Sequence, residues 1–182
     1  MQIRELTLAA SAAGVKEARL YLNSVLITRN FILGSNGHKL ARIIRDDDQS
    51  LPEDLEKIII PIAAVKSFLK KFGKKDELTT FEVVKIGAKY ALSAHYGDMV
   101  EVFEPLDHAY PDFKRAFAKI GAEQGLKESL TDYDYELLGD AQKAINTYLS
   151  KKGGPVKLTR RDTLGYFQPT DGIIYIVMPC TI

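Results

Sequence analysis

Hydrophobic and polar positions along this chain predict the same arrangement three times, one helix followed by three strands. Helices are indicated where apolar residues recur every three or four positions, and strands where apolar and polar residues alternate. The three groups cover residues 2–45, 61–103 and 135–179. A group of this size cannot bury both faces of its own sheet, so the groups are expected to pack against one another.

Turn and breaker residues set the ends of the predicted elements. Pro61 is expected to begin the second helix. Asn36-Gly37 predicts a tight hairpin, because a type I′ turn needs two residues that tolerate positive φ. The alternation slips near Asn23, which fits either a bulge or a strand that is buried on both faces. The helices are expected over 2–13, 61–72 and 135–149, with a short one over 113–120, and the strands over 18–28, 31–35, 39–45, 57–60, 81–86, 90–95, 99–103, 156–159, 164–168 and 173–178.

Composition and charge narrow the class of protein. The chain has 182 residues, of which 46% are hydrophobic and 27% charged, as in a globular protein with a proper core. The formal net charge is +1, so any contact with nucleic acid must rest on a local basic face or on encirclement. The single cysteine, Cys180, argues against a disulfide-stapled secreted domain, so the cytoplasm is the expected compartment. Neither a signal peptide nor a membrane-spanning stretch is expected.

Motifs for catalysis and for cofactor binding are missing from the sequence. There is no Walker loop, no Gly-x-Gly-x-x-Gly and no nucleophile elbow. His95 and His108 have no nucleophile or acid at a spacing typical of a catalytic site. One cysteine and three dispersed histidines form no familiar zinc-ligand pattern, so neither a metal nor a cofactor is expected. The acidic run over 45–54 is interpreted as a solvated loop. The chain is therefore expected not to be an enzyme.

Five short motifs follow one another along nearly the whole chain. They are Arg-Leu-Tyr-Leu-Asn at 19–23, Ser-Asn-Gly-His-Lys-Leu-Ala at 35–41, Ile-Pro at 60–61, Tyr-Pro-Asp-Phe-Lys-Arg at 110–115 and Tyr-Ile-Val-Met-Pro at 175–179. In this order they resemble motifs of the bacterial sliding clamp family, the β subunit of DNA polymerase III. The resemblance implies an α+β protein with the DNA-clamp fold, made of repeated helix-plus-antiparallel-sheet units that amount to about one and a half clamp domains.

The resemblance also divides the chain into two parts. Residues 1–119 resemble the second of the family's three domains without its first strand, and residues 120–182 resemble the latter half of the third domain. The first domain has no counterpart. A family ring is built from half-units like these, so three units in each chain imply a homo-oligomer of about four chains. Because the usual ring contact joins the first domain to the third, a ring of this chain needs a different contact.

A peptide-binding pocket is implied where the family binds short motifs of polymerases and of the clamp loader. The implied residues are Leu22, Ser35, Gly37, His38, Lys39, Leu40, Val177, Met178 and Pro179. An apolar cleft with a few backbone partners suits a short peptide with apolar anchors, and methionine is an adaptable lining residue. Two plainer interpretations stay open. His38 also fits a polar residue after a tight turn, and Met178-Pro179 also fits the end of an edge strand.

Basic residues on the second predicted helix suggest a second partner. Lys66, Lys70 and Lys74 recur every four residues, beside the apolar stripe of this helix. They are interpreted either as DNA-facing residues that touch phosphates without reading bases, or as a solvated face. Glu136 and Asp140 of the third helix argue against a uniformly basic pore, although acids near a helix start also suit its dipole.

Two functional hypotheses from different classes follow. In the first, the chain is a sliding-clamp-like accessory (processivity) protein of DNA replication, which tethers a polymerase through the pocket and encircles double-stranded DNA as an oligomer. In the second, it is an adaptor or decoy that forms no ring and competes with a host clamp for polymerase or clamp-loader motifs. A third, plainer hypothesis is a degenerate relative with a structural role. None of them involves a membrane.

Overall fold

The helices and strands follow one another along the chain in the predicted order. The computed structural model describes residues 2–45, 51–72, 79–114, 117, 133–150, 154–161 and 164–179. The described helices are α1 (Ile3–Ala12), α2 (Ile62–Phe72) and α4 (Tyr135–Tyr148), with a 3-10 turn η1 over Leu20–Asn23. The described strands are β1 (Ser24–Thr28), β2 (Phe31–Ser35), β3 (Lys39–Ile44), β4 (Lys57–Pro61), β5 (Thr79–Ile86), β6 (Lys89–Tyr96), β7 (Met99–Phe103), β8 (Leu158–Arg161), β9 (Leu164–Thr170) and β10 (Ile173–Val177). The predicted α+β class with repeated helix–sheet units is confirmed.

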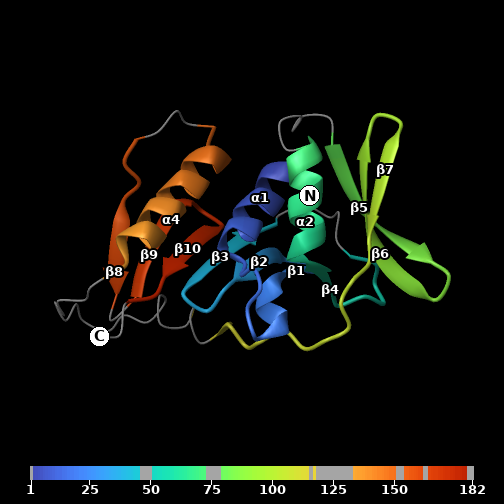
Figure 1. Cartoon of the computed structure of the whole chain (residues 1–182), viewed down its shortest axis with the longest axis horizontal. Helices are drawn as coiled ribbons and strands as arrows, with labels where there is room; N and C mark the ends of the chain where they lie inside the picture. Colours follow the sequence, from blue (N-terminus) through green and yellow to red (C-terminus); the bar gives the residue numbers. More distant parts are fainter. Residues whose placement is uncertain are drawn as a thin grey trace.

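The strands form two antiparallel sheets (Figure 1). The larger has seven strands in the order β4-β1-β2-β3-β10-β9-β8, and the smaller has three in the order β5-β6-β7. The first and third groups share the larger sheet, because β3 pairs with β10 from Lys39↔Val177 to Ile43↔Ile173. The boundary expected between residues 119 and 120 lies outside the described residues, and the large sheet continues from one part of the chain into the other.

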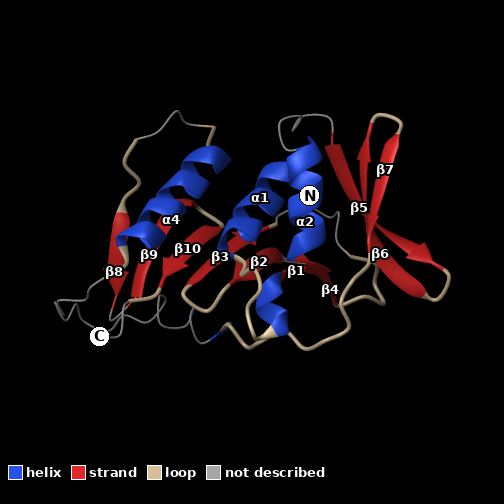
Figure 2. Cartoon of the chain, in the orientation of Figure 1, coloured by secondary structure: helices blue, strands red, loops and turns tan. Residues whose placement is uncertain are grey.

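One face of the large sheet is covered by helices (Figure 2). Helix α1 contacts both α2 and α4, and the three helices lie on the same side of the sheet. Apolar side chains of alternate strand positions point toward them, including Val25, Ile43 and Tyr175, each at most 1% exposed. Gly34 of β2 lets α1 approach closely, because a Cβ there would clash with the carbonyl oxygen of Ala9. The helices are therefore held by close packing against a continuous apolar surface.

The opposite face of the large sheet is covered by the connector that follows β7. Leu26, Leu33, Leu40 and Ile176 are buried on this face, and Leu106, Tyr110, Phe113 and Phe117 of the connector pack against them. The ring of Phe113 meets that of Phe31 edge to face, with centroids 5.5 Å apart. The N–H of Leu106 donates to the carbonyl of Ile59 at 2.7 Å. Strands of the large sheet are thus buried on both faces.

An aromatic cluster packs the small sheet against α2. Phe68 of α2 is 1% exposed, and its ring meets those of Phe81 and Phe103 edge to face, with centroids 5.4 and 5.6 Å apart. The cluster covers only the helix-facing side of the small sheet. The two sheets therefore differ in how completely they are buried.

The strand predicted over 18–28 is shorter than expected. Residues before Ser24 form η1 instead, where the N–H of Leu22 donates to the carbonyl of Arg19 at 2.9 Å. The side-chain amide of Asn23 accepts a hydrogen bond from the backbone N–H of Glu17 and donates one to its carbonyl, both at 2.8 Å. These local bonds compete with the hydrogen bonds that a β-strand would form here. The slip in alternation therefore marks a turn that leads into a strand buried on both faces.

Other predicted elements differ little from the structure. The start of the helix predicted at Pro61 is observed one residue later, and Gly73 lies outside the described residues, as does most of the helix predicted over 113–120. Among the described residues, no helix combines the length and apolar character that crossing a membrane requires.

Candidate functional site

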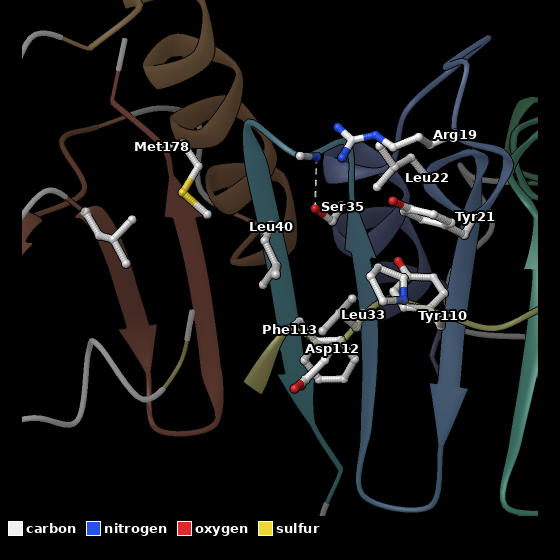
Figure 3. A pocket seen from close by; sticks show the side chains of 13 residues that line it. Arg19, Tyr21, Leu22, Leu33, Ser35, Leu40, Tyr110, Asp112, Phe113 and Met178 are labelled. Carbon is white, nitrogen blue, oxygen red and sulfur yellow. Dashed lines mark hydrogen bonds between the residues drawn. The ribbon is translucent and has the colours of Figure 1, made fainter. Parts of the chain in front are cut away.

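A hollow of about 480 Å³ lies on the connector-covered face of the large sheet (Figure 3). Its wall comes from three parts of the chain, namely the segment from η1 to β3, the connector and the strands of the third group. The lining residues are Arg19, Tyr21, Leu22, Leu33, Ser35, Gly37, Leu40, Tyr110, Pro111, Asp112, Phe113, Leu164 and Met178. The hollow thus joins residues that are far apart in the sequence.

The hollow is apolar at its base and carries charge at its rim. Leu33, Leu40 and Leu164 are at most 4% exposed. Arg19 and Asp112 are exposed residues of the lining, with opposite charge. A ligand that fits must therefore offer apolar groups to the base and polar or charged groups to the rim.

The strands beneath the hollow have no free edge. Strand β3 pairs with β2 on one side and with β10 on the other. The hollow therefore presents side chains of these strands rather than unpaired backbone groups.

Hydrogen bonds fix the hairpin between β2 and β3. The Ser35 hydroxyl donates to the carbonyl of Lys39 at 2.9 Å and accepts from the N–H of Gly37 at 3.1 Å. The Asn36 side chain accepts from the N–H groups of His38 and Lys39, at 3.0 and 2.9 Å. Gly37 has φ of +89°, a conformation that favours glycine. The hairpin is thereby preorganised without a ligand.

The residue after β10 is tied to this hairpin. The N–H of Met178 donates to the carbonyl of His38 at 2.7 Å. This bond extends the β3–β10 ladder past the end of β10 and keeps the Met178 side chain on the hollow's side of the sheet. The C-terminal segment therefore contributes one wall.

Five of the nine residues predicted for the pocket line the hollow, namely Leu22, Ser35, Gly37, Leu40 and Met178. The other four lie elsewhere. Val177 is fully buried on the helix-facing side, because side chains alternate along a strand and Ile176 and Met178 take the opposite side. His38 is exposed in the turn and contributes its carbonyl, and Pro179 follows Met178 without lining the hollow.

Lys39 also points to the helix side of the sheet. Its ammonium lies 3.0 Å from the carboxylate of Asp140 in α4, and its side chain is only 10% exposed. This ion pair ties the hairpin of the first group to the helix of the third. Lys39 thus supports the hollow by holding its two walls together.

Eight of the lining residues were not predicted from the sequence, namely Arg19, Tyr21, Leu33, Tyr110, Pro111, Asp112, Phe113 and Leu164. Several of them lie in the 19–23 and 110–115 motifs, so a signal was present. Their side chains could not be assigned to the hollow, because the connector has no regular periodicity. Burial raises the pKa of the Tyr110 phenol, which stays neutral near pH 7 and presents an uncharged hydroxyl to this wall.

The predicted basic face is only partly described. Lys66 and Lys70 are exposed on α2, on the helix side of the molecule, and Lys74 lies outside the described residues. The neighbouring Lys71 pairs with Glu101 of β7 at 3.5 Å. The exposed residues of α4 include Glu136, so the described helical surface mixes charges of both signs.

His95 has two close partners that the sequence did not suggest. The hydroxyl of Ser93 and the carboxylate of Glu82 both lie 2.8 Å from its Nε2 atom. In a nucleophilic triad the nucleophile and the acid bond different ring nitrogens of the histidine. This cluster therefore lacks triad geometry. No group of metal-ligating side chains is found among the described residues.

Comparison with solved structures identifies the fold as that of the bacterial DNA sliding clamps. A DNA polymerase III subunit beta from Pseudomonas aeruginosa matches with a TM-score of 0.70 and 15% identity, over 98% of this chain and 64% of that chain. A putative DNA polymerase III beta subunit from Eubacterium rectale matches with a TM-score of 0.70 and 10% identity, over 99% and 63%.

A third solved structure shows a clamp with a ligand. The sliding clamp from Bartonella birtlesii, bound to griselimycin, matches with a TM-score of 0.68 and 14% identity, over 100% of this chain and 65% of that chain. This chain thus spans slightly less than two thirds of the length of these clamps. No protein-family model and no curated protein matches the chain.

Proposed function

We propose that this chain is a non-enzymatic accessory protein of DNA replication that binds a short peptide segment of a polymerase or clamp loader. The observation that carries the proposal is the apolar hollow between Leu22, Leu40 and Met178, on a fold shared with sliding clamps. The hairpin and the C-terminal segment that form its walls are fixed by hydrogen bonds within the chain. Such preorganisation lowers the entropic cost of binding a flexible peptide.

The shape and charge of the hollow indicate the kind of peptide. The buried leucines at the base favour leucine- or phenylalanine-like anchors. Arg19 at the rim favours a carboxylate on one end of the peptide, and Asp112 favours a donor or cation on the other. The peptide would lie across β2, β3 and β10 rather than beside them, because these strands have no free edge.

A peptide titration tests the proposal. A fluorescent peptide with the apolar anchors of a clamp-binding motif is titrated against the wild type, Met178→Asp and Met99→Asp. Met178 lines the hollow, whereas Met99 is 48% exposed on the small sheet, so the same exchange serves as a control. We expect Met178→Asp to weaken binding at least about tenfold, or ~1.4 kcal/mol, and Met99→Asp to leave it unchanged. Equal affinities for all three proteins, or no binding to the wild type, would contradict the proposal.

Encirclement of DNA is a second part of the proposal. Lys66 and Lys70 are exposed on α2, on the side of the molecule that carries the helices. We propose that these lysines face phosphates without reading bases. An oligomer that closes around DNA should stay on a closed plasmid and slide off when the plasmid is cut once. Equal release from both forms would contradict encirclement and leave peptide binding intact.

The decoy hypothesis differs in this second part only. The observation that favours it is the mixed charge of the described helical surface, where Lys66 and Lys70 of α2 are accompanied by Glu136 of α4. A decoy binds the peptide, fails to stay on closed plasmid and displaces the same peptide from a complete clamp. The plasmid and titration experiments together therefore separate the two functions.

A further inference from the structure

We propose that the open edge of β7 is the site at which two copies of this chain pair, strand to strand, about a two-fold axis. The proposal is independent of the peptide pocket, which lies on the other sheet. Three strands hold equivalent places in the three groups. β3, β7 and β10 are each the third strand after a helix in their own group. β3 and β10 pair with each other, whereas β7 is at the edge of its sheet.

Side chains at this edge are unusually apolar for an exposed strand. Met99, Val100 and Val102 are 48%, 58% and 44% exposed, so three large hydrophobic side chains gather within four residues. Edge strands that remain single usually carry lysine, proline or a bulge, which discourage pairing. β7 has the sequence Met-Val-Glu-Val-Phe and pairs with β6 without a shift in register. It therefore has none of these three features, and its one charged residue is Glu101.

Backbone geometry leaves the bonding groups of two valines at the open edge. β6 and β7 are joined by a two-residue turn, and Tyr96 pairs with Met99 next to it. The residues that close such a turn bond to each other, and bonding direction alternates along an antiparallel pair. Met99, Glu101 and Phe103 thus face β6, while the N–H and C=O groups of Val100 and Val102 face outward. These are the groups that a second strand would bond.

A two-fold axis at Glu101 gives a register in which the outward N–H and C=O groups of Val100 and Val102 in both copies are hydrogen-bonded. Val100 of one copy then lies opposite Val102 of the other, and the valines form a continuous stripe on the sheet face away from the helices. The two Glu101 side chains meet on the helix-facing side, where each lies 3.5 Å from Lys71 of its own chain. The ammonium group of Lys71 in each chain offsets the repulsion between these two carboxylates, which lie directly opposite each other.

The helix-facing side of β6 and β7 is not completely filled. A hollow of about 420 Å³ on the helix-facing side is lined in part by Phe68, Met99 and Glu101. Pairing of the two β7 strands would join two three-stranded sheets into one sheet of six. The occupant is a second copy rather than an unrelated strand, because β3 and β10, the equivalent strands of the other two groups, already pair with each other in this antiparallel way.

Sedimentation over a concentration series tests the pairing. We expect the wild type to form dimers as its concentration rises, and the Val100→Lys/Val102→Lys double variant to stay monomeric. Ile86→Lys is the matched control, because Ile86 is 55% exposed at the far end of β5. It should dimerise like the wild type. A wild type that is monomeric throughout, or a double variant that dimerises as well as the wild type, would overturn the proposal.

Cross-linking tests the register without disturbing the valines. In a Cys180→Ser background, Glu101→Cys places one thiol in each copy beside the axis, where the two Cα atoms would be about 4.5 Å apart. We expect mild oxidation to give a disulfide-linked dimer. Glu104→Cys, which lies off the axis, should give little. Equal cross-linking at both positions, or none at 101, would overturn the register. Met178→Asp should cross-link at 101 as the parent does, which separates this proposal from peptide binding.

Discussion

The two sheets of this protein are made of similar strands but are buried to different extents. The seven-stranded sheet has helices on one face and the connector on the other, and both faces form apolar cores. The three-stranded sheet is anchored on its helix-facing side by Phe68, while Val100 and Val102 stay exposed on the other. A sheet covered on both faces can hold a rigid hollow, whereas a sheet with a bare face and an open edge strand can bind another copy.

Removal of the aromatic anchor of the small sheet should have the largest effect. Phe68→Ala leaves a cavity between α2, β5 and β7 and should lower the free energy of unfolding by about 3–5 kcal/mol. Denaturant unfolding measures this change, and hydrogen exchange should show that β5 to β7 lose protection first. Tyr135→Ala is the control, since Tyr135 is 89% exposed, and should cost less than about 0.5 kcal/mol. Similar losses in the free energy of unfolding from both variants would show that Phe68 stabilises the protein no more than an exposed side chain does.

High pH should destabilise the protein through the large sheet. Burial raises the pKa of Tyr175 to about 12, against 10 for the free side chain. Above pH 10 the unfolded chain releases this proton while the folded chain keeps it, so stability falls as pH rises toward 12. The loss should reach about 2–3 kcal/mol near pH 12, since each unit of pKa difference contributes ~1.4 kcal/mol.

Tyr175→Phe isolates this contribution. The variant should lose less stability between pH 10 and 12 than the wild type in a series of denaturant titrations. Its stability near pH 7 should change by less than about 1.5 kcal/mol, because at most one weak hydrogen bond, to the Ser11 side chain, is lost. Tyr135→Phe, at an exposed position, should follow the wild type. An unchanged slope in Tyr175→Phe would show that other groups cause the effect.

Loss of the connector's cover should weaken both stability and peptide binding. Phe113 packs edge to face against Phe31 and lines the hollow. Phe113→Ala should lower the free energy of unfolding by about 2 kcal/mol, less than a fully buried phenylalanine would. Val102→Ala, on the bare face of the small sheet, should cost less than about 0.5 kcal/mol. Parallel unfolding and peptide titrations measure both effects. Comparable losses in the free energy of unfolding at the two positions would show that the two sheets are not buried to different extents.

The ion pair between the first and third groups should have the smallest effect. Lys39 is nearly buried, but Asp140 is 61% exposed, so water screens the pair. A double-mutant cycle with Lys39→Met and Asp140→Asn should give a coupling energy of about 0.5–1 kcal/mol. A coupling energy near zero would show that the β3–β10 ladder alone holds the two groups together.

The order of helices and strands follows from the sequence, because periodicity and turn residues act locally. The repeated groups, the Asn36-Gly37 hairpin and the helix after Pro61 are of this kind. The pairing of β3 with β10 is not, since strands so far apart in the sequence leave no local sign of their contact. The resemblance to sliding clamps carried this information instead, by placing the 35–41 and 175–179 motifs at one pocket.

Details of the hollow were predicted less well than its location. The resemblance implied consecutive residues of the 35–41 and 175–179 motifs as pocket residues. A strand, however, presents only every second side chain to one face. Strict alternation would have assigned Val177 and Lys39 to the helix side and kept Met178 and Leu40. The connector residues Tyr110 and Phe113 could not be assigned in this way, because their segment has no period.

The most direct test of the central claim follows the methyl groups of the chain's methionines by NMR while a clamp-binding peptide is added. The chain has three methionines, and Met178 lines the hollow while Met99 lies on the small sheet. The account predicts that the Met178 signal moves or broadens in proportion to the peptide bound, and that the Met99 signal stays in place. A Met178 signal that does not respond at saturating peptide, or equal changes at both residues, would contradict it.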